Sequence, residues 1–311
     1  MLAPKKRKGL PMSTERETEA LRDLADGLAS EGRYEEAVEI YGRLVRDDPE
    51  SDSPLMSLAW TYRDWGKEEE AVRCLETLFE REIRRRVFTG FAFDEMVRLF
   101  REKGMHDRLV SLCERVAEAQ PEDPALLCTL GEAYLGAGQG EQAVRVFGKL
   151  AEMEPEASAY LCLLGNAHVI AGDPEKAVEC YEKAVALEPG KSHVFFGRLG
   201  NRFARTGDLE RAERILRRAV SEKPDDPLSH CGLGDVLIRR GRTGEARKAY
   251  DRAIALDGAS REGYLNRMGR SLLEGGRFGE AAAVFEELLS LSPENPIHRR
   301  NLEEARRLGK G

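Results

Sequence analysis

Five histidines and six cysteines supply the side chains that most often act as bases, nucleophiles or metal ligands. The histidines lie far apart, and none stands in a His-Glu-x-x-His motif that would hold zinc. His168 and His230 occupy positions where apolar residues recur in their segments. We expect a buried, hydrogen-bonded histidine at each of them rather than a ligand or a base.

Other motifs of enzyme sites do not occur in the sequence. There is no Cys-x-x-Cys pair, no serine in a Gly-x-Ser-x-Gly turn and no phosphate-binding loop. Cysteines without such pairs indicate a reducing compartment rather than a disulfide framework. Neighbouring carboxylates such as Glu35 and Glu36 stand where a helix should begin and complement its dipole. We therefore predict a protein that is not an enzyme and binds no cofactor and no metal.

The segment 158–189 shows which elements build the chain. Its apolar and small residues recur three and four positions apart in two stretches, which predicts two amphipathic helices. Gly172 can end the first helix, Asp173 can cap the second, and Pro174 suits its first turn. Small residues at Gly165 and Ala177 let the helices pack closely. One hairpin cannot bury both apolar faces alone, so the pattern predicts stacked neighbours.

The same hairpin recurs along the chain every 34 to 38 residues. The position of Ala177 is repeated at Ala37, Ala71, Leu109, Ala143, Ala212, Ala246 and Ala281. A turn glycine precedes each marker by five residues, at Gly32, Gly66, Gly104, Gly138, Gly172, Gly207, Gly241 and Gly276. Closing prolines follow six hairpins, at Pro49, Pro121, Pro155, Pro189, Pro224 and Pro293.

This pattern resembles that of the tetratricopeptide repeats, with about eight copies over residues 18–293. The resemblance implies an all-α fold. It is an α-solenoid in which antiparallel helix hairpins form a right-handed superhelix, and its concave groove binds proteins. The first helix of each pair would line that groove. We expect a disordered basic tail at 1–15, a solenoid of eight repeats at 16–293, and a capping helix and tail at 294–311 that covers the last repeat with Leu302, Ala305 and Leu308.

The groove positions of repeats five to eight carry more arginines than acids, whereas acids prevail in repeats one to four. Such a field would orient a charged partner. Family members hold peptide backbone through asparagines at the position of Asn166 and Asn201. We hypothesise that an extended or acidic peptide segment binds here, and the candidate residues are Asn166, Asn201, Arg198, Arg205, Arg239, Asn266, Arg267 and Arg270. The alternative is a solvated polar face without a ligand.

Some members of the family clamp a C-terminal carboxylate with basic residues. Cys162, Leu228 and Gly232 stand at those positions here, so we do not expect that mode of binding. Cys128, Cys162 and Cys231 recur at one position of the first helices, and we expect them to line the groove as small apolar residues. Side chains one repeat apart would lie about 10–20 Å from each other, too far to share a metal ion.

The closing proline is missing after repeat two, where Ile83 stands, and the next interval is 38 residues. The helix can therefore continue before repeat three begins near Gly90. The junction offers a possible second interface, because arginines and aromatic residues are enriched at interface cores. Its residues are Arg84, Arg85, Arg86, Phe88 and Phe91. The alternative is an extended helix whose aromatic residues, Phe93 among them, fill the joint.

The basic block from Lys5 to Lys8 resembles a nuclear-import signal, but it also fits a solubilising tail, or sequence upstream of a true start at Met12. The net charge of −7 argues against nucleic-acid binding, and no apolar run approaches a membrane span. We therefore predict a soluble cytoplasmic protein, or a nuclear one if the block is a signal, that is a monomer or weak homo-oligomer.

The predicted function is that of a noncatalytic scaffold or adaptor with a protein or peptide partner. The alternative is a substrate-recruiting or regulatory subunit of an enzyme complex, for example of a transferase, acting in trans.

Overall fold

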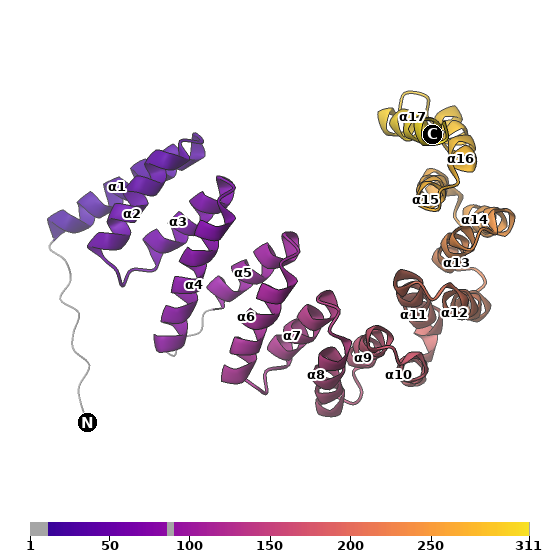
Figure 1. The fold of residues 1–311 in the computed structure, drawn as a ribbon, viewed down its shortest axis with the longest axis horizontal. Coiled ribbons are helices and arrows are strands. Elements are labelled where there is room, and N and C mark those ends of the chain that lie inside the picture. Colours follow the sequence, from indigo (N-terminus) through magenta and orange to yellow (C-terminus); the bar gives the residue numbers. More distant parts are fainter. Residues whose placement is uncertain (1–11, 86–89, 311) are drawn as a thin grey trace. The chain divides into compact units, whose positions relative to one another are not determined.

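A computed structural model describes the backbone of residues 12–85 and 90–310, with side chains from Arg16 onward. Within these ranges the chain is helical and has no strand (Figure 1). The helices are α1 (Met12–Ser30), α2 (Tyr34–Asp47), α3 (Ser53–Asp64), α4 (Glu68–Arg85), α5 (Phe91–Glu102), α6 (His106–Ala119), α7 (Pro124–Gly136), α8 (Gly140–Met153), α9 (Ser158–Ala171), α10 (Pro174–Leu187), α11 (Ser192–Thr206), α12 (Leu209–Glu222), α13 (Pro227–Arg239), α14 (Thr243–Leu256), α15 (Arg261–Glu274), α16 (Phe278–Leu291) and α17 (Pro296–Leu308). Short 3₁₀ helices, η1 (Pro189–Lys191) and η2 (Gly258–Ser260), precede α11 and α15.

The helices form two compact units, one ending at Leu112 and the other beginning at Cys113. In the first unit α1 packs on α2 and α3 on α4, and in the second unit each odd-numbered helix from α7 to α15 packs on the even-numbered helix that follows it. Consecutive hairpins of one unit also contact each other, as α2 contacts α3 and α10 contacts α11. The predicted all-α solenoid of helix hairpins is confirmed. The right-handed superhelix remains a prediction.

The turns between paired helices lie where the repeat pattern predicts them. Gly172 follows α9 with a φ of 83°, a left-handed conformation that a residue with a Cβ rarely adopts. The next residue, Asp173, accepts a hydrogen bond from the backbone N–H of Lys176 and caps α10. The other predicted turn glycines also have positive φ angles, and the marker positions are buried without exception. The period of the sequence therefore locates each hairpin correctly.

The core of the second unit is continuous from one hairpin to the next. It extends from Cys162 on α9 to Ala305 on α17, and large aromatic rings fill the space between neighbouring helices. Fully buried rings among these are Tyr181, Phe196, Phe203, Tyr250 and Phe285. Each hairpin completes the burial of its neighbour, so the stability of the unit depends on the interfaces between repeats.

Both ends of the predicted solenoid can be compared with the structure. Helix α1 begins at Met12, earlier than the expected start at residue 16, and the basic block from Lys5 to Lys8 lies outside the described residues. At the other end α17 packs on α16 and buries Leu302 and Ala305, as a capping helix should. Leu308 is less well covered than these two residues. This last residue of the helix is 39% exposed, because no further turn of helix shields it.

The two histidines predicted to be buried differ. His230 is buried, and its Nε2 lies 2.9 Å from the carbonyl oxygen of Pro224, as expected for a structural histidine. His168 is only half-buried, which corrects the prediction for this residue. Burial nevertheless lowers the pKa of His168, so its neutral form is favoured.

Candidate functional site

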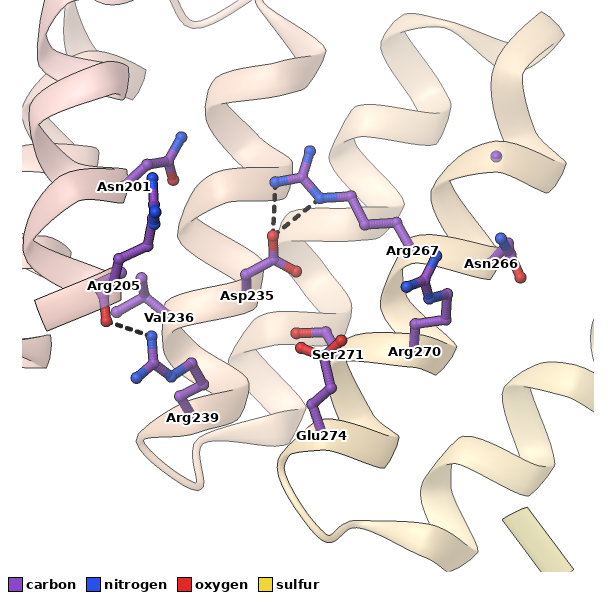
Figure 2. Close-up of a pocket in the computed structure, with 12 residues that line it drawn as sticks. Asn201, Arg205, Asp235, Val236, Arg239, Asn266, Arg267, Arg270, Ser271 and Glu274 are labelled. Carbon is purple, nitrogen blue, oxygen red and sulfur yellow. Dashed lines mark hydrogen bonds and ion pairs between the residues drawn. The ribbon is translucent and has the colours of Figure 1, made fainter. Parts of the chain in front are cut away.

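A pocket of about 450 Å³ opens in the second unit, where the first helices of three successive hairpins lie next to one another. Figure 2 shows side chains from α11, α13 and α15 converging on it. It is lined by Asn201, Ala204, Arg205, Asp235, Val236, Arg239, Gly263, Asn266, Arg267, Arg270, Ser271 and Glu274. Six of the eight groove residues predicted from the sequence are among them, so helices far apart in the sequence bring these six together.

Close packing between paired helices determines which residues reach the pocket. Gly234 on α13 lies so near α14 that an added Cβ would be 2.7 Å from the Tyr250 ring. Gly200 and Gly269 have the same role on α11 and α15. The residue after each glycine is therefore turned about 100° from the packed face. These residues are Asn201, Asp235 and Arg270, and each lines the pocket.

Asp235 is the acceptor of a hydrogen-bond network on the wall of the pocket. Arg267 donates to its Oδ2 from both Nε, at 2.9 Å, and Nη2, at 2.6 Å (Figure 2). The hydroxyl of Tyr250 donates to the other carboxylate oxygen, Oδ1. Burial and the Asp235 charge both raise the pKa of Tyr250, so this hydroxyl stays protonated. Burial alone would lower the pKa of Arg267, but Asp235 outweighs it and the net shift is upward. Arg267 and Asp235 therefore neutralise each other.

The remaining charges leave the pocket with an excess of positive charge. Arg205, Arg239 and Arg270 are exposed, and Glu274 is the one other carboxylate in the lining. Arg239 donates from Nη1 to the backbone carbonyl of Ala204 near the end of α11 (Figure 2). Within the described residues, the guanidinium groups of Arg205 and Arg270 make no hydrogen bond or ion pair. Planar guanidinium groups that are not neutralised suit the carboxylate or phosphate oxygens of a ligand.

The two predicted asparagines do not have equivalent surroundings. Asn201 is exposed and lines the pocket. Asn166 on α9 does not line it, and its Oδ1 already accepts hydrogen bonds from the hydroxyl of Tyr181, at 3.0 Å, and from Nε of Arg202, at 3.1 Å. Arg198 is exposed on α11 outside this pocket. Asn266 accepts a hydrogen bond of 3.3 Å from Asn301 on α17.

Sequence reasoning missed the interactions of two residues near the site. Arg202 was absent from the predicted set, although it lies one helical turn after Arg198 and could have been found by that spacing. Asp235 was also absent from that set, and its pairing with Arg267 joins residues 32 positions apart. Such a pairing depends on the rotation between neighbouring repeats.

Cys162 and Cys231 are buried and do not line the pocket, which corrects the prediction for these two residues. Cys128 is partly buried. Each of the three cysteines lies three residues before a close-packed glycine, at Gly131, Gly165 and Gly234, and so shares its inward face. Burial raises the pKa of Cys162 to about 11, so the thiol is uncharged and unreactive near neutral pH.

The junction after repeat two lies in the first unit. Helix α4 continues to Arg85, as predicted. Arg85 donates from Nη1 to Oδ2 of Asp52, at 2.6 Å, and from Nη2 to Oε2 of Glu50, at 2.9 Å. The Phe91 ring lies edge-on to the Trp60 ring, with centroids 5.7 Å apart. Arg85 therefore ties α4 to the loop between α2 and α3, and Phe91 packs on α3.

Phe93 is buried, in agreement with the alternative that aromatic residues fill this joint. Arg84 is exposed, and Arg86 and Phe88 lie outside the described residues. A second interface at Arg84, Arg85, Arg86, Phe88 and Phe91 remains a prediction.

No group of three or more histidine, cysteine or carboxylate side chains is placed to hold a metal ion in the part of the chain that the structure describes. None of the described helices combines the length and the apolar character needed to cross a membrane.

Three family models match the chain. Residues 20–53 and 53–82 each match a model of the tetratricopeptide repeat. Residues 95–308 match the model of the cilia and flagella-associated protein 70 C-terminal domain.

Individual proteins are also similar to the chain, either over a smaller part of it or at lower sequence identity. Cellulose synthase operon protein C of Xanthomonas axonopodis pv. citri is 35% identical over 82 residues, which are 26% of this chain and 5% of that protein. The chain therefore spans a small part of this relative. A tetratricopeptide repeat protein from Parabacteroides merdae is 16% identical, with a TM-score of 0.41 over 93% of this chain and 99% of its own. The protein MamA, known from a crystal structure, is 23% identical, with a TM-score of 0.36 over 52% of this chain and 93% of its own. Because the match at residues 95–308 covers more than half of the sequence, the chain belongs to the family of the cilia and flagella-associated protein 70 C-terminal domain, a family of tetratricopeptide-repeat proteins.

Proposed function

We propose that this tetratricopeptide-repeat protein is a noncatalytic adaptor that binds an extended, acidic peptide segment of a partner protein in the pocket on α11, α13 and α15. The observation that carries the proposal is the charge of this pocket. Once Asp235 and Arg267 have paired, Arg205, Arg239 and Arg270 face a single remaining carboxylate, that of Glu274. Acidic side chains of a partner would compensate this charge.

The shape of the site fits a peptide in an extended conformation. Packed helices lie about 8–10 Å apart, so a ligand that crosses from α11 to α15 spans about 20 Å. An extended chain covers that distance with about six residues at 3.3 Å each. The side-chain amides of Asn201 and Asn266 offer donors and acceptors to the backbone of such a segment.

The proposal is tested with a defined probe, a fluorescent peptide of about eight residues in which glycine and glutamate alternate. The double variant R239E/R270E should lower its affinity by about tenfold or more, because a charge-assisted hydrogen bond contributes about 1.5–3 kcal/mol. Fluorescence anisotropy over a range of salt concentrations measures the effect, since screening should weaken the binding of the unchanged protein.

The matched control is R214E/R252E, which makes the same change in charge on the second helices of the same unit. Arg214 on α12 and Arg252 on α14 are exposed and do not line the pocket. The proposal is wrong if the two double variants bind the probe equally well. It is also wrong if a peptide with glutamine in place of glutamate binds as tightly.

A further inference from the structure

Three arginines form a row along one face of α11. Arg198, Arg202 and Arg205 are spaced four and three residues apart, which places them above one another on a helix. Arg198 and Arg205 are exposed, and Arg202 is half-buried between α9 and α11. None of the three forms an ion pair within the described residues. In the described part of the chain, the one hydrogen bond of their guanidinium groups runs from Nε of Arg202 to Oδ1 of Asn166.

The first helices on either side of α11 supply no free carboxylate to this row within the described residues. The sequence of α9, from Ser158 to Ala171, contains no acidic residue. On the other side α13 carries Asp235, which is already bound to Arg267. Burial lowers the pKa of Arg202, and the nearby charge of Arg205 adds to the effect, as expected for a cation that is not compensated. Like charges at this spacing destabilise an isolated helix.

The corresponding network two hairpins later has the compensating charge that this one lacks. Asn166 follows the close-packed Gly165 as Asp235 follows Gly234. Each accepts a hydrogen bond from the tyrosine of its own hairpin, Tyr181 or Tyr250, and another from an arginine of the next first helix. The difference is an amide in one network and a carboxylate in the other. Arg267 is thereby neutralised, whereas Arg202 keeps its net charge.

We infer that Asn166, because its side chain is uncharged, leaves the positive charge of Arg202 able to bind an anion. Arg198, Arg202 and Arg205 then form an anion subsite at the edge of the pocket. This inference rests on the proposed function and extends it. The subsite would take clustered anionic oxygens of the bound peptide, from acidic side chains two residues apart or from one phosphorylated side chain. Alternate side chains of an extended peptide are about 6.6 Å apart, close to the 5–6 Å between arginines on neighbouring helical turns.

The decisive variant is Asn166→Asp, which retains every arginine. The new carboxylate should pair with Arg202 as Asp235 pairs with Arg267, and it should weaken binding of the glycine–glutamate probe about tenfold, the scale of one charge-assisted hydrogen bond. The reciprocal variant Asp235→Asn should release Arg267 and leave the affinity unchanged or higher. Arg202→Gln alone should cause a loss of similar size, because either single change lowers the charge of the row by one unit.

Wild-type affinity in Asn166→Asp would overturn the inference. Thermal unfolding of each variant establishes that it folds. If Asn166→Asp does not fold, Arg198→Glu serves instead, because Arg198 is exposed on α11, and unchanged binding there counts equally against the subsite. If R239E/R270E loses binding and Asn166→Asp does not, the subsite is refuted and the proposed function is retained. If Asn166→Asp loses binding and R239E/R270E does not, the pocket is refuted as the binding site.

Peptides that differ only in the anion identify its source. Replacement of one glutamate by phosphoserine should strengthen binding if the row takes a phosphoryl group, and this gain should disappear in Asn166→Asp. If the row takes paired carboxylates, the peptide with alternating glutamates should bind best. Equal binding of both peptides and of the glutamine peptide would contradict the subsite.

Discussion

Arg267 on α15 donates two hydrogen bonds to a single carboxylate oxygen of Asp235 on α13 and so joins two successive hairpins of the second unit. The pair is partly exposed, with 39% of the arginine and 26% of the aspartate side chain accessible. An ion pair of this kind stabilises a fold only modestly, because solvent screens it. The pair also neutralises one positive and one negative charge in the pocket.

Replacing Arg267 with methionine should lower the free energy of unfolding by about 1 kcal/mol, and less at high salt. Asp235 would keep the hydroxyl of Tyr250 as a donor but lose its cation. Urea denaturation at low and high salt measures both effects. Arg270→Met is the control, because Arg270 lies on the same helix and is exposed. Equal destabilisation by the two variants would contradict the structural importance assigned to the pair.

Gly165 should not tolerate a larger side chain. An added Cβ would lie 2.7 Å from Cδ2 of the buried Tyr181 ring, so α9 and α10 would have to separate. We expect Gly165→Ala to destabilise the protein by about 1–3 kcal/mol, the usual cost of overpacking. Gly148→Ala on α8 meets nothing within 4 Å and should be stabilising by up to about 1 kcal/mol, because alanine favours helix. Thermal or denaturant unfolding compares the two, and a gain in stability from Gly165→Ala would refute the close packing.

The hairpins could be predicted from the sequence because their determinants are local. Gly172 must end α9 since it adopts a left-handed conformation, and Ala177 must be small because α9 packs against it. The glycine recurs in every copy and the small residue in every copy except repeat three, where Leu109 stands, so a single period reveals the turns and the buried positions together. The four residues added before Leu109 did not obscure this, because α4 simply continues to Arg85.

The site was harder to predict, because small rotations of a helix decide which side chains reach the groove. Cys162 was assigned to the groove but lies on the packed face with Gly165, and the spacing of three residues between them contained that information. No comparable signal shows that Arg202 reaches Asn166. That contact spans 36 residues and depends on how one hairpin is rotated on the next.

Asp208 should be needed for the start of α12. Its Oδ1 accepts a hydrogen bond of 3.0 Å from the backbone N–H of Arg211, and its Oδ2 accepts one of 2.7 Å from the Arg211 side chain. Removal of such a cap costs about 0.5–2 kcal/mol, so Asp208→Ala should lower the unfolding midpoint in urea. Asp225→Ala removes the same charge from an exposed loop residue and should have little effect. A shift of equal size in both variants would mean that net charge, and not the cap, is responsible.

Glu213 on α12 should make the stability of the second unit depend on pH. Its side chain is buried, with 7% accessible, and its carboxylate accepts hydrogen bonds from Arg217, Arg240 and Arg242 at 2.6 to 2.9 Å. Burial alone would raise the pKa of Glu213, but the hydrogen bonds from Arg217 and Arg242 outweigh it, and the net shift is below 4.5. The ionised form is therefore favoured in the folded state. The contribution of ionised Glu213 to the free energy of unfolding is fully present above pH 4.5, the ordinary pKa of the group. It disappears as the pH falls through the lower pKa that Glu213 has in the folded state.

Replacement of Glu213 by glutamine should consequently destabilise the protein by about 1–3 kcal/mol at neutral pH, the range for hydrogen bonds to charged groups. The difference from the unchanged protein should shrink as the pH is lowered below 4.5, since the wild-type carboxylate then becomes protonated as well. Denaturant unfolding at a series of pH values measures this convergence. Glu210→Gln, on an exposed residue of the same helix, should give a curve parallel to that of the wild type. Parallel curves for Glu213→Gln would show that the three arginines do not stabilise an ionised Glu213 in the fold.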